Sequence, residues 1–120
     1  MTMINLLVGV AVRDIEAATA WYGQLIGWPP HPHPVPKLVE WQFEEGGWLQ
    51  LFEDANRAGS SSVTFFEDSL DERVAQLKRL EIEIGQTSDT DRFKTAIIAD
   101  PDGNRLIFAE VLSAGKRAIS

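Results

Sequence analysis

The stretch LLVGVAVRDIEAATAWYGQLIG, residues 6–27, decides how this chain folds. It opens with a run rich in Val and Leu, which is typical of a β-strand, and continues into apolar residues spaced three and four positions apart. These apolar residues are Ala18, Trp21, Tyr22, Leu25 and Ile26. Asp14 precedes them as a suitable N-cap, and Gly27 follows them as a suitable C-cap. The stretch therefore predicts a strand that leads directly into an amphipathic helix.

The same pattern returns in the second half of the chain. A strand-like run, SSVTFFED, precedes Ser69, and Glu72 stands three residues after Ser69 as in a capping box. The apolar stripe of this second helix is Leu70, Val74, Leu77 and Leu80. The two copies align at an offset of 55 residues, which pairs Asp14 with Ser69. We interpret this match as an internal duplication.

Two further strand patterns follow each helix. LVEWQFEEGGWLQLFE (38–53) predicts two strands around Gly46–Gly47, and FKTAIIADPDGNRLIFAE (93–110) predicts two around residues 100–103. These hairpins align at an offset of 57 residues. The segment PPHPHPVP (29–36) occupies the place of another strand, and its prolines cannot donate to a ladder, so we expect a sheet edge or an irregular loop there. The expected fold class is α+β.

Composition excludes several classes of protein. The 120 residues are 44% hydrophobic, as in globular proteins, and the net charge of −7 with scattered basic residues argues against nucleic-acid binding. With no cysteine there is no disulfide framework or thiolate ligand. The apolar N-terminal run lacks a basic region and a cleavage site, and it is too short to span a membrane. We expect a cytoplasmic protein without a membrane or nucleic-acid partner.

Two stretches, VAVRDIEAATAWYGQLIGW and DPDGNRLIFAE, resemble the opening and closing stretches of the vicinal oxygen chelate superfamily. That superfamily includes glyoxalase I, extradiol dioxygenases, fosfomycin resistance enzymes and bleomycin resistance proteins. The resemblance extends from about Ile4 to Val111. It implies one domain, residues 1–120, made of two βαβββ modules at about 4–54 and 60–112 that form a curled mixed sheet around a cup. It also implies a homodimer, because a second subunit often completes or supports the cup.

The resemblance further assigns four positions on the floor of the cup where metal-dependent members carry their ligands. In this chain these positions hold Leu7, Gln50, Ser62 and Ile107. A divalent cation in such a site needs imidazole nitrogens and carboxylate oxygens, and Leu and Ile supply neither. We therefore expect the usual metal site to be absent and predict no cofactor.

His31 and His33 are the two histidines of the chain. In an extended segment, residues two apart share a face, so the imidazoles could converge on one ion if Glu40, Glu44 or Glu45 supplied a third ligand. We favour the first of two alternatives over this metal site, and give the second a smaller share. In one the histidines are surface residues, and in the other they border the mouth of the cup as hydrogen-bonding or acid–base groups.

Strand alternation predicts the lining of the cup. If Leu7 and Ile107 face inward, Gly9, Ala11, Arg105 and Ala109 do too. On the same count the residues that face the helices are Val8, Val10, Val12, Leu106 and Phe108. The predicted ligand-binding residues are Leu7, Trp41, Trp48, Gln50, Phe52, Ser62, Thr64, Phe66, Arg105 and Ile107. Aromatic faces favour planar or cationic ligands, and Arg105 favours a carboxylate. The aromatic side chains could instead fill the cup and leave a closed core.

Three hypotheses about function follow. The first is a metal-independent small-molecule binding protein, resembling the bleomycin resistance proteins, that sequesters an aromatic, cationic or carboxylate ligand. The second is a lyase, isomerase or dioxygenase of the same superfamily, with atypical metal ligands or metal-free acid–base catalysis. The third is a structural or interaction role with a closed cup. The sequence assigns no catalytic residue.

Overall fold

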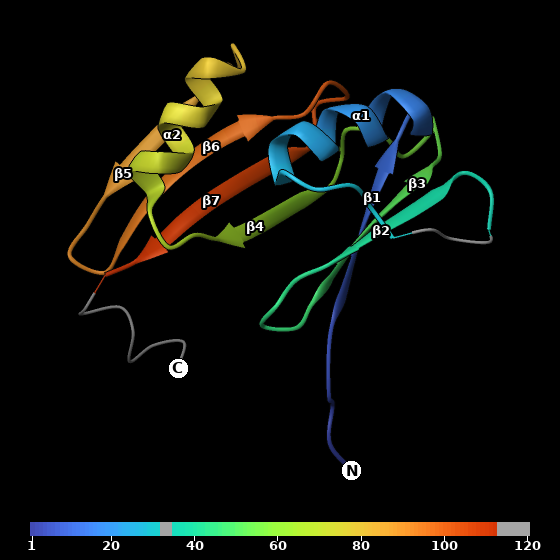
Figure 1. The fold of residues 1–120 in the computed structure, drawn as a ribbon, viewed down its shortest axis with the longest axis horizontal. Helices are drawn as coiled ribbons and strands as arrows, with labels where there is room; N and C mark the ends of the chain where they lie inside the picture. Colours follow the sequence, from blue (N-terminus) through green and yellow to red (C-terminus); the bar gives the residue numbers. More distant parts are fainter. Residues whose placement is uncertain (32–34, 113–120) are drawn as a thin grey trace. The chain divides into compact units, whose positions relative to one another are not determined.

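The computed structural model describes residues 1–31 and 35–112 and divides the chain into two compact units (Figure 1). The first unit contains Met1–Ser61 and Pro101–Asn104, and the second contains Ser62–Asp100 and the residues from Arg105 onward. Each unit has one helix and one mixed sheet. The predicted α+β class and the duplicated pattern are confirmed. Closure of both units around one cup stays a prediction from the resemblance.

The first unit contains β1 (Leu7–Val12), α1 (Ile15–Ile26), β2 (Leu38–Gln42) and β3 (Trp48–Glu53). The strand order is β1-β3-β2, with β1 parallel and β2 antiparallel to β3. The Pro-rich segment contributes an isolated bridge between His31 and Glu40. For the described residues of this segment, the single bridge beside the edge strand β2 agrees with the predicted sheet edge, and residues 32–34 lie outside them.

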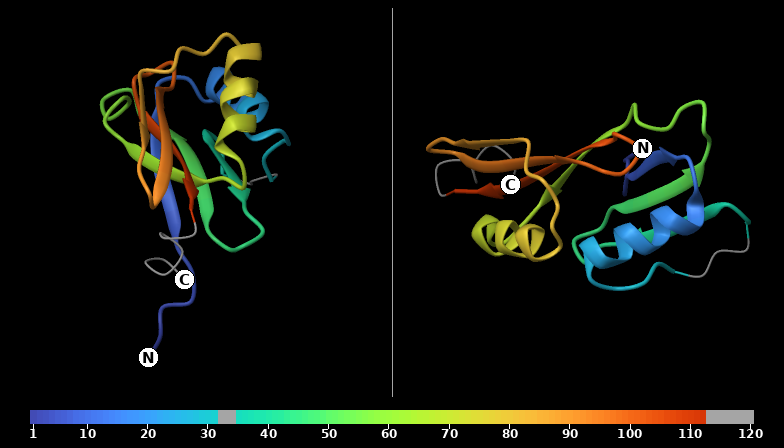
Figure 2. Two further views of the ribbon diagram at one scale, coloured as in Figure 1. Left: turned by 90° about the vertical axis from the view of Figure 1, so that its left-hand side faces the viewer. Right: turned by 90° about the horizontal axis from the view of Figure 1, so that it is seen from above.

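The second unit contains β4 (Ser62–Phe66), α2 (Leu70–Arg79), β5 (Gln86–Asp89), β6 (Phe93–Ala99) and β7 (Arg105–Val111). The strand order is β4-β7-β6-β5, and β4 runs parallel to β7. In each unit the helix lies against one face of its own sheet (Figure 2). The opposite face, called the open face below, carries no helix of that unit.

The predicted helix caps are present. The Asp14 carboxylate accepts hydrogen bonds from the backbone N–H groups of residues 16 and 17, and Gly27 ends α1 with φ of 100°. The Ser69 hydroxyl accepts from the N–H of Glu72. These side chains satisfy N–H groups that the first helical turn leaves without partners.

A second carboxylate reaches the start of each helix from the closing strand of the same unit. Glu53 Oε1 accepts from the N–H of Ile15 at 3.2 Å, and Glu110 Oε1 accepts from the N–H of Leu70 at 2.8 Å. The two glutamates stand 57 residues apart, the offset at which the hairpins align. A negative charge at this end stabilises the helix dipole. The duplication therefore repeats a tertiary contact as well as a pattern.

The hydrophobic core of each unit lies between its helix and its sheet. In the first unit it contains Val10, Val12, Tyr22, Leu25, Trp41, Leu49 and Leu51, and in the second Val63, Leu70, Leu77, Ala96, Ile98, Leu106 and Phe108. Of the predicted helix-facing residues of β1 and β7, Val10, Val12, Leu106 and Phe108 are among them, whereas Val8 is only half-buried. The side chains on the alternate positions therefore belong to the open faces.

Asn104 gives the DPDGN segment a role beyond the turn that the sequence predicts. The side chain is fully buried. Its Oδ1 accepts from the N–H groups of Gly59 at 3.0 Å and Ser61 at 2.9 Å, and its Nδ2 donates to the carbonyl of Ala11 at 2.9 Å. Asn104 therefore fixes the segment after β3 against β1 within the first unit.

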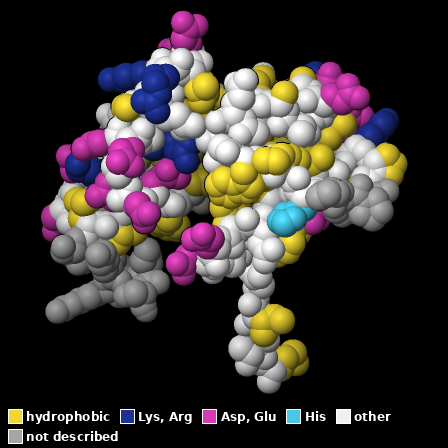
Figure 3. Space-filling view, in the orientation of Figure 1, with side chains coloured by type: hydrophobic (Ala, Val, Ile, Leu, Met, Phe, Trp, Pro, Cys, Tyr) yellow, Lys and Arg dark blue, Asp and Glu magenta, His cyan; other side chains and the backbone are white. Residues whose placement is uncertain are grey.

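The chain segment before β1 carries exposed apolar side chains. Met1, Met3, Ile4 and Leu6 are all largely exposed, and hydrophobic side chains are visible on this segment in Figure 3. Among the described residues, no helix is long and apolar enough to cross a membrane.

Candidate functional site

The candidate site is the open face of the first sheet. The register places Leu7 beside Trp48 and Gly9 beside Gln50 on neighbouring strands. Phe52 has the same parity and therefore shares this face. The arrangement agrees with the predicted alternation for β1 and β3. Ligand binding by these residues stays a prediction.

A polar row crosses the middle of this face. Gln50 Nε2 donates to Glu40 Oε1 at 2.9 Å, and the two residues are direct partners across β3 and β2. On the other side of β2, the N–H of His31 donates to the carbonyl of Glu40 at 2.8 Å. Both side chains of the central pair are half-buried, whereas His31 is exposed. The row thus brings an imidazole, a carboxylate and an amide to one face.

Aromatic rings stand at one end of the polar row. The ring centroids of Trp48 and His31 are 5.7 Å apart, with an interplanar angle of 46°. Trp48 is on β3 and His31 pairs with the opposite edge of β2, so the two rings meet over β2. This ring pair supplies an apolar surface next to Glu40.

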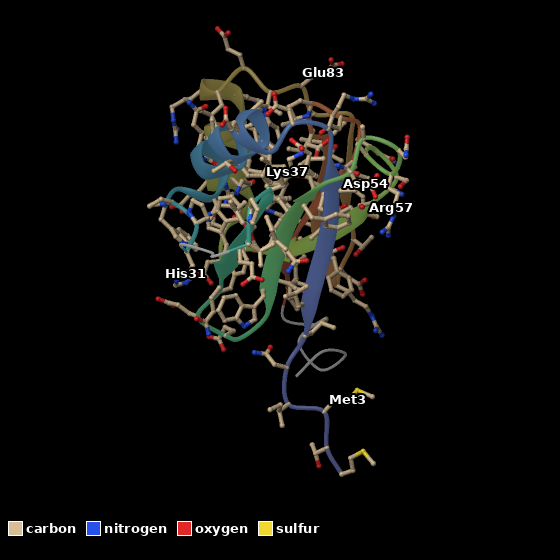
Figure 4. All side chains as sticks on the ribbon, turned by 90° about the vertical axis from the view of Figure 1, so that its right-hand side faces the viewer. Met3, His31, Lys37, Asp54, Arg57 and Glu83 are labelled. Atoms are coloured by element: carbon tan, nitrogen blue, oxygen red, sulfur yellow. The ribbon has the colours of Figure 1, made fainter. Side chains whose placement is uncertain are left out.

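The other end of the face is formed by Phe52 and Arg57. A Cβ atom at position 9 would lie 3.3 Å from Cε1 of Phe52, which is a tight contact. Because Gly9 has no Cβ atom, the Phe52 ring can lie directly beside β1. The Arg57 guanidinium carbon lies 5.4 Å from the centroid of Phe52. His31 and Arg57 lie on opposite sides of the three strands (Figure 4). Sequence reasoning missed Arg57, because it belongs to a polar connection with no pattern of its own.

The prediction that Trp41 lines the same face is wrong. Trp41 pairs with Leu49, which points toward α1, and its side chain is fully buried. Its ring centroid lies 6.4 Å from that of Tyr22, and its Nε1 donates to the carbonyl of Trp28 at 2.9 Å. The alternation of β2 instead presents Glu40 to the open face. The large aromatic ring is stabilised by burial against the helix.

The remaining predicted residues lie on the open face of the second sheet. The register sets Ser62 opposite Arg105, Thr64 opposite Ile107, and Phe66 opposite Ala109. Phe66 is 60% exposed, and Arg105 is also exposed. The structure therefore groups the predicted ligand residues into two sets, one for each unit.

The positions that the resemblance assigns to metal ligands do not fit a divalent cation. Leu7 and Ile107 have no donor atom, and the Gln50 amide hydrogen-bonds to Glu40. Ser62 offers one neutral hydroxyl. In residues 1–31 and 35–112 no three His, Cys, Asp or Glu side chains are grouped so as to hold a metal ion. His33 lies outside the described residues, so the His31–His33 hypothesis extends beyond them.

An open groove of about 430 Å³ lies elsewhere on the first unit, beside the starts of α1 and β2. Its lining consists of Ile15, Glu16, Thr19, Val35, Pro36, Lys37, Leu38 and Val39. None of the predicted ligand residues is among them. The groove and the candidate site are therefore separate features.

Comparisons with known proteins agree with this architecture. Residues 4–108 match the family described as the glyoxalase/bleomycin resistance protein/dioxygenase superfamily. A glyoxalase/bleomycin resistance protein from Catenulispora acidiphila DSM 44928 is 33% identical, with a TM-score of 0.80, and the match covers 91% of this chain and 99% of that one. A search of curated proteins found no match.

Two other solved structures share the fold. TnmS3, an antibiotic binding protein from Streptomyces sp. CB03234, is 21% identical with a TM-score of 0.78, over 92% of this chain and 98% of that one. A lactoylglutathione lyase from Agrobacterium tumefaciens is 20% identical with a TM-score of 0.76, over 92% and 95%. The chain belongs to the glyoxalase/bleomycin resistance protein/dioxygenase superfamily, as its sequence resemblance implied.

Proposed function

We propose that this protein binds a small aromatic molecule on the open face of its first sheet, without a metal ion, and sequesters it. The observation that carries the proposal is the composition of that face. Trp48 and Phe52 flank Gln50, while Leu7 stands where the resemblance assigns a metal ligand. Stacking and hydrogen bonding then replace metal coordination as the means of holding a ligand.

The face has the chemistry of a small-molecule site. Such sites combine apolar or aromatic walls with a few polar groups that orient the ligand. Here the walls are aromatic, and the polar groups are Glu40, which favours a cation, and Arg57, which favours a carboxylate. The antibiotic binding protein TnmS3 has the same fold and supports a binding role. A homodimer and a cytoplasmic location are part of the same proposal.

The test is a binding screen with matched tryptophan variants. We expect some of a panel of aromatic cations, carboxylates and neutral molecules to raise the Tm of the protein and to bind in calorimetric titrations. Trp48→Ala should weaken binding about tenfold, because one stacking surface is lost. Trp28→Ala is the control, since the ring of Trp28 contacts Phe43, which is not one of the residues of the polar row. No binding by any compound, or equal loss in both variants, would contradict the proposal.

A second candidate function is an enzyme of the superfamily, either metal-free or with atypical ligands. It is favoured by the backbone bridge between His31 and Glu40, because an imidazole and a carboxylate on directly paired residues are groups suited to acid–base catalysis. Metal content of protein purified without a histidine tag tests the metal-dependent form of this candidate. Stoichiometric metal that is lost in His31→Ala would favour the enzyme, and metal at background level would leave only acid–base chemistry.

A further inference from the structure

The Arg57 guanidinium places a positive charge on an aromatic ring of the open face of the first sheet. Its central carbon lies 5.4 Å from the centroid of the Phe52 ring, and the register of β3 with β1 assigns Phe52 to that face. Arg57 is exposed and Phe52 is half-buried. The charged group therefore lies over the face and remains accessible to an incoming molecule.

No acidic side chain of the described residues neutralises Arg57. In residues 1–31 and 35–112 the guanidinium forms neither an ion pair nor a hydrogen bond, and its side-chain contact is the ring of Phe52. Asp54, three residues earlier, accepts through its Oδ1 from the N–H of Asn56 at 3.1 Å. A guanidinium carries five N–H donors and no acceptor. These donors are available to an anion from solution.

The backbone of the connection after β3 holds Arg57 in place. The N–H of Arg57 donates to the carbonyl of Asp54 at 3.2 Å, and the N–H of Asp54 donates to the carbonyl of Val12 at 2.9 Å. On the other side of Arg57, the N–H of Gly59 donates to the buried Asn104 Oδ1 at 3.0 Å. The turn is thus tied to the first unit on both sides of Arg57. A fixed backbone lowers the entropic cost of ordering this segment when a ligand binds.

The aromatic surface extends from Phe52 along β3. Trp48 and Phe52 share the open face four residues apart, and both are half-buried. A strand rises about 3.3 Å per residue, so the two positions are about 13 Å apart. A single ring that meets Arg57 through a carboxylate does not reach Trp48, whereas two linked rings extend along most of this distance.

We infer that the open face of the first sheet selects an elongated aromatic carboxylate, with its carboxylate at Arg57 and its rings along Phe52 and Trp48. The inference rests on the proposed function and names the ligand class of that site. A guanidinium and a carboxylate form two parallel N–H···O bonds, and the rings supply stacking. The net charge of −7 disfavours anions over the protein as a whole, so selection of an anion must come from a local cation.

Three probes test the inference. Biphenyl-4-carboxylate is the elongated anion, biphenyl-4-carboxamide is its neutral counterpart of nearly equal shape, and benzoate is the short anion. In titrations of the intact protein followed by NMR chemical shifts, biphenyl-4-carboxylate should bind about tenfold more tightly than either of the others. Trp48→Ala should weaken both biphenyl compounds and change benzoate little, because only the longer molecules reach that ring.

Arg57→Gln is the decisive variant. It removes the charge but keeps a polar side chain, so the preference for biphenyl-4-carboxylate over biphenyl-4-carboxamide should disappear. Arg57 is exposed, so the Tm should stay near that of the parent. Arg92→Gln removes one positive charge from an exposed position in the second unit and should keep the preference. A Tm measurement for each variant separates loss of selection from loss of folding.

The outcomes distinguish this inference from the proposal beneath it. Equal affinity for the two biphenyl compounds in the parent protein overturns selection of a carboxylate, yet leaves aromatic binding intact if Trp48→Ala still weakens both. A preference that survives in Arg57→Gln, or that is lost equally in Arg92→Gln, also overturns it. Benzoate that binds as tightly as biphenyl-4-carboxylate overturns the elongated shape. If neither biphenyl compound binds but others of the wider panel do, the inference fails alone, and if no compound binds, the proposed function fails too.

Discussion

Replacing Asn104 with Ala should be among the most destabilising single changes in the first unit. The change removes hydrogen bonds from a fully buried side chain to the N–H groups of Gly59 and Ser61 and to the carbonyl of Ala11. The N–H groups of Gly59 and Ser61 and the carbonyl of Ala11 then lose their partner. Gly59 and Ser61 are half-buried, so water can reach those N–H groups, but Ala11 is 2% exposed.

The size of the effect follows from this difference in burial. A buried polar group left without a partner costs about 1–3 kcal/mol, and a group that water can reach costs less. About 2 kcal/mol for the buried Ala11 carbonyl and about 0.5 kcal/mol for each of the two N–H groups that water can reach give a loss of about 3 kcal/mol in the free energy of unfolding. The total free energy of unfolding of a small domain is only about 5–15 kcal/mol. With an m-value of about 2 kcal/mol per molar urea, the unfolding midpoint should fall by about 1.5 M.

Two further variants make the test specific. Asn56→Ala changes an exposed asparagine of the same connection and should alter the free energy of unfolding by less than about 0.5 kcal/mol. Asn104→Asp keeps acceptors for Gly59 and Ser61 but faces the Ala11 carbonyl with an oxygen, so it should still destabilise. A loss below about 1 kcal/mol for Asn104→Ala would refute the reasoning, because the three bonds would then contribute almost nothing.

Three other changes probe contacts that the structure supplies. Gly59→Ala should cost more than about 2 kcal/mol in urea unfolding, because a Cβ would lie 2.5 Å from a backbone oxygen at a residue with φ of 93°; unfolding like the parent would contradict this. Glu110→Ala should cost about 1–2 kcal/mol by removing the acceptor at the N–H of Leu70, and an unchanged midpoint would exclude that role. Gly9→Ala should change the Tm little but displace the Phe52 ring and weaken binding of aromatic probes; unchanged affinity would show that this ring takes no part.

The elements predicted best are those that local chemistry defines. Asp14 and Gly27 mark the two ends of α1 because capping depends on residues within one turn of the helix end. The repeat at Ser69 then predicts α2 by the same argument. Alternation likewise predicts the faces of β1, β3, β4 and β7.

The predictions that failed or were missed depend on contacts between distant residues. Both faces of β2 carry apolar residues, so only its pairing with β3 shows that Trp41 points toward the helix. That pairing depends on the length of the turn at residues 43–47, which the strand pattern does not give. Asn104 hydrogen-bonds to Ser61, Gly59 and Ala11, which are 43, 45 and 93 positions away in the sequence. Arg57 reaches Phe52 from an irregular segment. No pattern in the local sequence indicates such contacts.

Comparison of the two modules within this chain shows which side chains are kept for folding and which differ between the modules. At the offset of 57 residues the helix-facing positions keep their character: Leu49 matches Leu106, Leu51 matches Phe108, and Glu53 matches Glu110. The open-face positions between them change in character: Trp48 corresponds to Arg105, Gln50 to Ile107, and Phe52 to Ala109. Burial and helix capping constrain the first set, because both units need them to fold. The open face carries no such constraint, and the aromatic residues that it holds in the first unit but not in the second are where the proposed ligand site lies.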